Sequence, residues 1–194
     1  MHDDGPSLVA RACAGDGDAF HAIFRRYFRP VLTFIYGLLG NRSQAEELAQ
    51  ETFVRAYRRL HTIRDKNRLS TWLFGIARNV VREAVKGKYT ARSGVSLEDA
   101  GAERLEGRQA SPDGQLLAGE LSGAIRDALL ELPEDGRTVF LLKVVHQMRY
   151  DEISRITGSS VGKLKTDLHR ARLQMRQKLL PYVGEQFSGM RGVS

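Results

Sequence analysis

The chain has 194 residues, a formal net charge of +7 and a hydrophobic content of 42%. This composition excludes an intrinsically disordered chain, because enough apolar residues are present to build a core. The single cysteine, Cys13, excludes an intramolecular disulfide, and no apolar run is long enough to span a bilayer. The acidic start of the chain lacks the basic-then-apolar order of a secretory signal, so we expect a cytoplasmic protein. The positive charge favours a polyanionic partner such as nucleic acid.

The first half of the chain has the apolar periodicity of helices. Apolar residues recur at helical spacing over residues 20–39, which predicts one buried stripe and a kink or division at Pro30. The next helix is predicted to begin at Ser43, because Ser43 and Glu46 have the spacing of a capping box. A third helix is predicted from about Ser70, and its later part is polar and basic.

The periodicity stops over residues 90–115, where the chain is rich in Gly, Ser, Ala and acidic side chains. This stretch has too few large apolar groups to offset the entropy of ordering its backbone, which predicts a flexible acidic linker. Helical spacing returns from residue 116, and Pro133 separates two helices. Two further helices are predicted over residues 150–157 and from 161 to about 180. No strand pattern occurs, so we expect an all-α chain of two small helical domains.

Residues 150–161 have the pattern of a helix-turn-helix. A short amphipathic helix would end at Gly158 in the left-handed conformation, and Ser159 or Ser160 would cap the next helix, which begins its buried face at Val161. The second helix of such a motif enters the major groove. Its other face is polar and mainly basic: Lys163, Lys165, Thr166, His169, Arg170, Arg172 and Arg176. An ordinary helical hairpin with a solvated basic face is the alternative.

Features that suggest nucleotide binding or catalysis lack the residue spacing that these functions require. The run 158–164 is one residue short of a phosphate-binding loop, and Leu164 stands where a magnesium-binding hydroxyl is needed. The histidines show no metal-ligand spacing with one another or with Cys13. We expect no catalytic residue, no metal site, no cofactor and no small-molecule substrate. An enzyme acting on nucleic acids is the least favoured functional class.

Four stretches stand out along the chain: residues 14–20 followed by 25–27, residues 45–57, residues 70–79, and residues 132–133 together with the helix-turn-helix and 168–172. In this order and spacing the chain resembles the extracytoplasmic-function group of sigma factors, which keep only the second and fourth conserved domains of larger sigma factors. The resemblance implies a non-catalytic subunit that directs RNA polymerase to promoters. The predicted domains are residues 7–89 and 116–183, with the linker 90–115 between them and a tail over 184–194.

The resemblance implies roles for two surfaces of the first domain. The stretch 45–57 is similar to the helix that docks on the clamp of the largest polymerase subunit, with Leu48, Phe53 and Tyr57 holding the fold. The polar residues implied in docking are Glu47, Gln50, Glu51 and Arg55. The region that recognises and opens the minus-ten element is implied for Arg64, Asp65, Lys66, Asn67, Arg68, Trp72, Arg78, Asn79, Arg82 and Lys86. Trp72 is a possible stacking platform, but a tryptophan at this helical position is more often a core residue. A solvated face is the less favoured alternative for the polar docking residues.

The resemblance also implies that the helix-turn-helix reads the minus-thirty-five element, and that the chain contacts the flap of the polymerase as well as its clamp. The implied contacts are Ser160, Lys163, Lys165, Thr166, His169, Arg170 and Arg172. The chain departs from the family at Asp167, where an arginine is usual, so a carboxylate there would repel phosphate or accept from a cytosine amino group.

The resemblance also implies a role for the linker and one further partner, and one rival function stays open. The resemblance implies that the acidic linker enters channels of the polymerase, and that an anti-sigma protein masks the same surfaces and holds the chain, at times at the membrane. The rival is a stand-alone helix-turn-helix regulator, which would bind DNA without polymerase and usually as a dimer.

Overall fold

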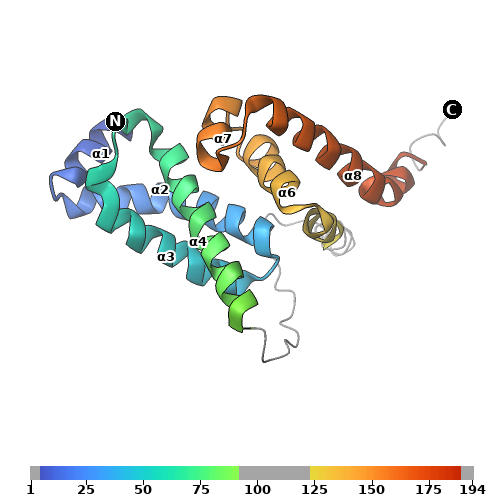
Figure 1. Ribbon diagram of the computed structural model, residues 1–194, viewed down its shortest axis with the longest axis horizontal. Helices are drawn as coiled ribbons and strands as arrows, with labels where there is room; N and C mark the ends of the chain where they lie inside the picture. Colours follow the sequence, from blue (N-terminus) through green and yellow to red (C-terminus); the bar gives the residue numbers. More distant parts are fainter. Residues whose placement is uncertain (1–4, 92–122, 189–194) are drawn as a thin grey trace.

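The computed structural model describes residues 5–91 and 123–188, and side chains over 7–87 and 123–182. Helices account for the regular structure of these residues, and no strand occurs among them, so the all-α prediction is confirmed. Residues 92–115 of the predicted linker and 189–194 of the predicted tail lie outside the described residues. Figure 1 shows the two helical domains side by side, and we call residues 5–91 the N-terminal domain and 123–188 the C-terminal domain.

The N-terminal domain is a bundle in which the long helices pack on one another. Its elements are α1 (Gly5–Cys13), α2 (Gly17–Leu39), α3 (Arg42–Arg59), the 3-10 turns η1 (Leu60–Thr62) and η2 (Lys66–Arg68), and α4 (Leu69–Ala91). The apolar stripe of α2 is buried at positions such as Ile23, Val31 and Phe34. Packing of this stripe on α3 and α4 supplies most of the helical stability, as is usual for amphipathic helices.

Helix α2 begins and ends at the signals that its sequence carries. The Asp16 carboxylate accepts a hydrogen bond from the Ala19 N–H at 3.0 Å, and Gly40 ends the helix with a left-handed φ of 70°. Pro30 lies inside α2 and does not divide it. The buried stripe on both sides of Pro30 holds the helix together although one backbone hydrogen bond is lost there.

The predicted cap of α3 is wrong by two residues. The helix begins at Arg42, and the Asn41 side chain accepts a hydrogen bond from the Gln44 N–H at 2.9 Å. Ser43 therefore lies inside the first turn and is exposed. The reason is that Asn41 and Ser43 are both good capping residues, and only the packed position of the helix decides between them.

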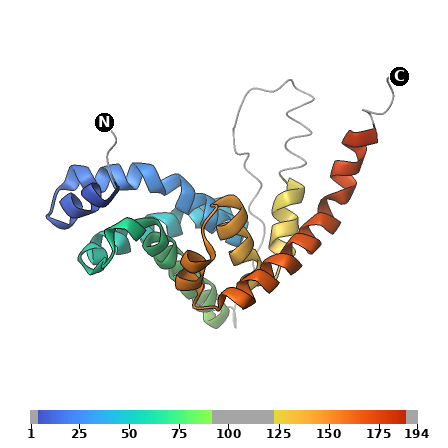
Figure 2. The ribbon, with the colours of Figure 1, turned by 90° about the horizontal axis from the view of Figure 1, so that it is seen from above.

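The C-terminal domain is built around the helix-turn-helix. A helical segment over 123–131 is followed by α6 (Glu134–Phe140), a π-helical turn η3 (Leu141–Val145), α7 (Tyr150–Thr157) and α8 (Val161–Ser188). The bounds of α7 agree with the sequence prediction. Seen from above, α8 extends away from the N-terminal domain toward the C-terminus (Figure 2).

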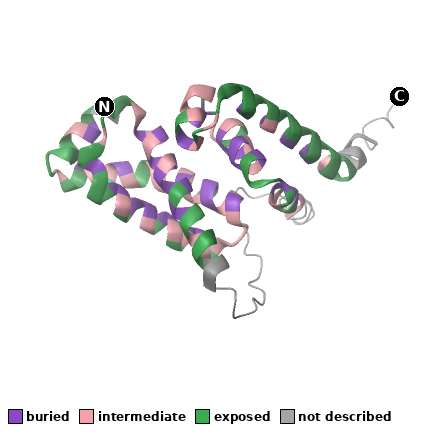
Figure 3. Cartoon of the chain, in the orientation of Figure 1, coloured by how far each residue is buried: buried purple, intermediate pink, exposed green. Residues whose placement is uncertain are grey.

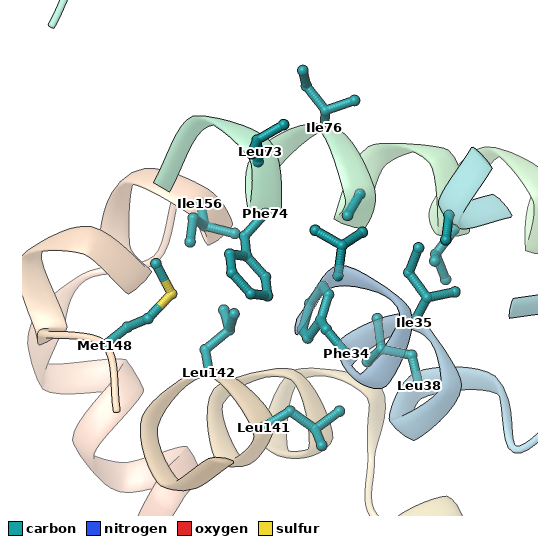
Figure 4. Close-up of a cluster of buried hydrophobic side chains, with 14 of the residues drawn as sticks. Phe34, Ile35, Leu38, Leu73, Phe74, Ile76, Leu141, Leu142, Met148 and Ile156 are labelled. Atoms are coloured by element: carbon teal, nitrogen blue, oxygen red, sulfur yellow. The ribbon is translucent and has the colours of Figure 1, made fainter. Parts of the chain in front are cut away.

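The two domains share one hydrophobic core. Phe34 and Phe74 of the N-terminal domain meet edge to face, with ring centroids 5.3 Å apart, and Leu142 lies against them from the C-terminal domain (Figure 4). The ring of His146 contacts Phe74 at 4.7 Å and Phe34 at 6.0 Å. The sequence did not predict this packing, because the residues are far apart in the chain and belong to different amphipathic helices.

Glycine and arginine residues bring the domain backbones close together. A Cβ atom at Gly37 on α2 would lie 2.7 Å from a terminal methyl group of Leu141, so the Leu141 side chain would have to shift to admit one. The guanidinium of Arg137 on α6 donates to the carbonyl of Leu38 at 2.6 Å and to Leu132 at 2.9 Å, and also to Leu130. Arg137 thus links the C-terminal end of α2 to the second domain.

Candidate nucleic-acid interface

The turn between α7 and α8 is fixed by local hydrogen bonds. Gly158 takes a left-handed φ of 74°, and the Ser154 hydroxyl donates to the Ser159 carbonyl at 2.7 Å. The Ser160 hydroxyl accepts from the Lys163 N–H at 3.3 Å, so Ser160 caps α8 and not Ser159, the other residue that the sequence offered. Ile153 and the inner face of α8 are buried beneath this turn. The geometry is that of a helix-turn-helix with a rigid second helix.

The outer face of α8 is exposed, as Figure 3 shows along the length of the helix. All the residues predicted to read DNA from this helix are exposed: Ser160, Lys163, Lys165, Thr166, His169, Arg170 and Arg172. The prediction that Val161 is buried is wrong, because this first residue of α8 is 37% exposed. A first-turn residue precedes the packed part of the helix, so the apolar stripe begins only at Leu164.

Lys163 is engaged by two carboxylates. Its ammonium lies 2.6 Å from Asp135 of α6 and 2.7 Å from Asp167, one turn further along α8. The hydrogen bonds to Asp135 and to Asp167 raise the pKa of Lys163, and the one from Lys163 lowers the pKa of Asp135. Asp167, which departs from the resembled family, therefore pairs with Lys163 along its own helix, and its side chain is only 17% exposed.

The loop before α4 presents its polar residues to solvent. Arg64, Lys66 and Asn67 are exposed, and Asp65 folds back to pair with Arg68 at 2.7 Å. The Asp65 carboxylate also accepts from the Asn67 N–H at 3.0 Å. The loop is thus a short capped turn with free polar side chains, which suits contacts with bases or phosphates.

The residues predicted along α4 differ sharply in exposure. Asn79, Arg82 and Lys86 are exposed, whereas Trp72 is half-buried and packs against the core, which supports its interpretation as a core residue. Arg78 is only 8% exposed. Burial and the neighbouring Arg82 lower the pKa of Arg78, while the carboxylates of Glu134 and Asp135 oppose that shift.

The exposed side of α3 carries the residues that the resemblance implies in docking. Glu47 and Gln50 are exposed, whereas Arg55 bridges Glu51 at 2.6 Å and Glu83 of α4. These hydrogen bonds raise the pKa of Arg55. Arg55 thus ties α3 to α4 in addition to any docking role.

The expectation that Tyr57 holds the fold is wrong. Its side chain is 63% exposed and touches the Phe20 ring edge to face at 4.9 Å. The position lies at the rim of the amphipathic stripe of α3, where periodicity alone does not separate buried from exposed residues. Tyr57 and the nearby Val54, 42% exposed, add an apolar element to the polar face of α3.

The sequence prediction missed the acidic groups that face α4 from the C-terminal domain. Glu134 lies 3.9 Å from Arg82 of α4, and Asp135 lies 2.6 Å from Lys163 of α8. The Glu-Asp pair directly after Pro133 was the only local signal. Within the described ranges, no cluster of three or more His, Cys, Asp or Glu suits a metal ion. No helix of those ranges has the length and apolar character needed to cross a membrane.

Comparison with known families identifies both domains. A family model described as Sigma-70 region 2 matches residues 23–89, and one described as Sigma-70, region 4 matches residues 122–175. The chain is 34% identical over 171 residues to the ECF RNA polymerase sigma factor SigW of Bacillus subtilis, covering 85% of this chain and 91% of that protein. It is 31% identical over 185 residues to the RNA polymerase sigma-H factor of Pseudomonas aeruginosa, covering 92% and 95%.

Solved structures share the fold. A structure of the sigma factor RpoE in complex with the anti-sigma factor NepR from Bartonella quintana matches with a TM-score of 0.67 and 21% identity, covering 82% of this chain and 96% of that chain. A structure of CnrH in complex with the cytosolic domain of CnrY matches with a TM-score of 0.66 and 22% identity, covering 91% and 97%.

Proposed function

Because the chain belongs to the extracytoplasmic-function family of RNA polymerase sigma factors, we propose that it binds core RNA polymerase and places both of its domains on promoter DNA. One observation carries this proposal. Each domain presents its own exposed polar surface, on α3 and the loop before α4 in one domain and on α8 in the other. A stand-alone regulator would leave the surface of α3 without a role, and both family models match, so that rival is not favoured.

The contact with the polymerase clamp is proposed for the exposed side of α3. Glu47 and Gln50 stand free on this side, with Tyr57 and Val54 beside them. A face that combines exposed aromatic and apolar groups with a polar rim is typical of a protein interface. Glu51 and Arg55 would contribute at the edge of this face, through the part of each side chain left free by their mutual ion pair.

The minus-ten contact is proposed for the loop before α4 and for the exposed side of α4. Opening a duplex requires an extruded base to find polar contacts, against a cost of about a few kcal/mol. The free polar groups of Arg64, Lys66 and Asn67 suit such contacts, and Asn79, Arg82 and Lys86 suit the adjacent backbone. Asp65, Arg68 and Trp72 would shape this surface, and Arg78 would join it after becoming exposed.

The minus-thirty-five contact is proposed for α8. Arg170 and Lys165 are exposed on the outer face of the recognition helix, and Ser160 and Thr166 offer hydroxyls near its start. His169 and Arg172 lie on the same face. Most of the affinity would come from phosphates, with base contacts supplying about 1–3 kcal/mol of discrimination each.

An anti-sigma protein is proposed as the regulator. Two solved structures that share this fold are complexes of the sigma factor RpoE with the anti-sigma factor NepR, and of CnrH with the cytosolic domain of CnrY. A protein that covers α3 or α8 of this chain would block the polymerase or DNA contact directly. The cytoplasm, where the polymerase works, is the location that follows from this function.

Reconstituted transcription tests the proposal. Purified protein, core polymerase and a fragmented genomic DNA library of the source bacterium are mixed, and the new transcript starts are mapped. We expect discrete starts that require both the protein and the polymerase. No start above the level of core enzyme alone would contradict the proposal.

Matched variants assign the two surfaces. We expect Glu47→Arg to weaken binding to core polymerase about tenfold or more, while Asp127→Arg, a charge reversal on an exposed helix of the other domain, leaves it unchanged. Arg170→Ala should reduce promoter binding by the holoenzyme and lower the salt dependence by about one phosphate contact. Lys178→Ala is the control, because it lies about 12 Å further along α8 and pairs with Glu131.

A further inference from the structure

Lys163, in the first turn of α8, is enclosed by carboxylates of two helices of the same domain. Its ammonium donates a hydrogen bond to the Asp135 carboxylate of α6 at 2.6 Å and to the Asp167 carboxylate, one turn further along α8, at 2.7 Å. We call these three residues the Lys163 cluster. One positive and two negative charges give the cluster a net charge of −1, so the cluster as a whole repels a phosphate.

The packing of α6 on α8 brings both carboxylates to Lys163. Figure 1 shows the two helices side by side. Gly136, the neighbour of Asp135, is buried, and a Cβ atom there would lie 3.7 Å from the Cβ atom of Ala171 and 3.9 Å from the Asp167 carbonyl oxygen. The backbone that carries Asp135 and Asp167 is therefore held beside the first turn of α8 by close packing.

The other cations on the outer face of α8 have no such enclosure. Within residues 7–87 and 123–182, no carboxylate forms an ion pair with the exposed side chains of Lys165, Arg170 or Arg172. The Lys165 ammonium lies over the Tyr150 ring, 5.8 Å from its centroid. An exposed cation–π contact of this kind is weak, so Lys165 can still bind a phosphate.

We propose that Asp135 and Asp167 keep Lys163 from contacting DNA, so that the cationic contacts of the recognition helix begin at Lys165. An ammonium that moves to a phosphate leaves two carboxylates behind, close to the same phosphate. The attraction gained is offset by the two ion pairs lost and by the repulsion that remains. This inference rests on the proposed function, since it divides the cations of α8 into those that bind promoter phosphates and one that does not.

The departure from the family at Asp167 thereby acquires a specific consequence. The sequence suggested that this carboxylate would repel phosphate or accept from a cytosine amino group, whereas in the structure it pairs with Lys163. The first turn of α8 thus offers no free ammonium to the minus-thirty-five element. Its charged contacts are displaced along the helix, toward the part that carries Thr166, His169 and Arg170.

A double-mutant cycle on the holoenzyme of the full-length chain tests the proposal. The probe is a promoter fragment recovered from the mapped transcript starts, and its affinity is measured over a range of salt concentrations. Lys163→Met is made in the wild-type chain and in an Asp135→Asn, Asp167→Asn background, where both carboxylates are replaced by neutral amides of the same shape.

We expect Lys163→Met to leave the salt dependence of promoter affinity unchanged in the wild-type chain. In the amide background the freed ammonium reaches a phosphate, so Lys163→Met should lower the slope of log affinity against log salt by about 0.9. The amide background itself should bind about threefold to tenfold more tightly than wild type, as suits one added ion pair with a phosphate.

Two substitutions of the same kind serve as references. Lys165→Met removes a proposed phosphate contact and should lower the slope by about 0.9 in the wild-type chain. Lys178→Met, at an exposed lysine of α8 that pairs with Glu131, should leave the slope unchanged.

Acetylation of the lysines gives a second measurement, which does not depend on affinity. The holoenzyme is treated with acetic anhydride with and without the promoter fragment, and the modified lysines are quantified by mass spectrometry. We expect the promoter to slow acetylation of Lys165 but not of Lys163 in the wild-type chain, and to slow both in the amide background.

The outcomes separate this inference from the proposed function. Protection of Lys163 by the promoter in the wild-type chain, or a change of slope as large as that of Lys165→Met, would overturn the inference alone. No effect of Lys163→Met in either background would also overturn it, because the carboxylates would then keep nothing from the DNA. An unchanged slope for Lys165→Met would overturn the DNA contact proposed for α8 and this inference together.

Discussion

Arg137 shows how one side chain can join two domains. Its guanidinium is partly buried and satisfies the carbonyls of Leu38, Leu130 and Leu132 at the ends of helical segments. Burial lowers its pKa, and no carboxylate accepts a hydrogen bond from it in the described structure. The Arg137 guanidinium therefore acts as a hydrogen-bond donor to carbonyl groups at helix ends. Those carbonyl groups would otherwise have no donor.

We predict that Arg137→Met lowers the free energy of unfolding by about 1–3 kcal/mol, because buried carbonyls lose their donors. The measurement is urea unfolding followed by circular dichroism. Arg58→Met, at an exposed arginine of α3, is the control and should change stability by less than about 0.5 kcal/mol. Equal effects of the two substitutions would show that the Arg137 hydrogen bonds contribute little.

His146 carries a pH dependence at the same interface. Its ring packs on Phe34 and Phe74, and burial lowers its pKa from 6.5 to about 4. The unfolded chain takes up a proton near pH 6.5, whereas the folded chain does so only near pH 4. The stabilisation from the neutral ring is therefore fully present above about pH 6.5 and is lost as the pH falls to about 4.

We predict that wild-type protein loses about 2 kcal/mol more stability between pH 6.5 and 4 than His146→Phe, in which an uncharged ring occupies the same site. Denaturant unfolding across this pH range measures the difference. His61→Phe, at an exposed histidine, should keep the wild-type slope. If the free energy of unfolding of His146→Phe fell with pH as steeply as that of wild type, carboxylates alone would cause the loss of stability.

At the scale of elements, local signals predicted the helices well where backbone conformation decides the boundary. Gly158 and Ser160 act through φ and through hydrogen bonds within a few residues, so α7 was placed correctly. Ser43, Val161 and Tyr57 were misplaced for a common reason. Each lies at the first turn of a helix or at the rim of its apolar stripe. At such positions the sequence is compatible with a buried or an exposed side chain, or with two helix starts, and tertiary packing selects one.

The cap of α3 gives a direct test of that choice. We predict that Asn41→Ala lowers the free energy of unfolding by about 1 kcal/mol, because the Gln44 N–H loses its acceptor. Ser43→Ala should have little effect or a slightly favourable one, since Ser43 is exposed inside the helix. Thermal and urea unfolding of both variants decide between Asn41 and Ser43, and a larger loss for Ser43→Ala would favour the capping box predicted from sequence.

At the scale of the whole molecule, the sequence predicted two helical domains but not their mutual packing. The polar residues proposed to bind DNA were found by pattern and by resemblance, and most of them are exposed. Arg78 differs because it is buried, and no local feature of the polar stretch around it predicts that burial. Contacts such as Phe34 with His146 leave no local periodic signal, because each residue already fits the apolar face of its own helix.

A shared core should make the two domains unfold together. Leu142 is fully buried in η3 of the C-terminal domain and lies against Phe34 and Phe74 (Figure 4). Trp72, the only tryptophan of the chain, reports on α4 in the N-terminal domain. We predict that Leu142→Ala destabilises the protein by about 2–4 kcal/mol and shifts the urea midpoint of Trp72 fluorescence as much as that of hydrogen exchange at the α8 amides.

The two probes must be compared with each other. If the second domain unfolded independently, the cavity left by Leu142→Ala would not move the urea midpoint of Trp72 fluorescence from its wild-type value. Leu180→Ala, at a side chain that is 60% exposed on α8, should move neither transition. Coincident shifts require that the free energy of the interface be lost whenever either domain unfolds.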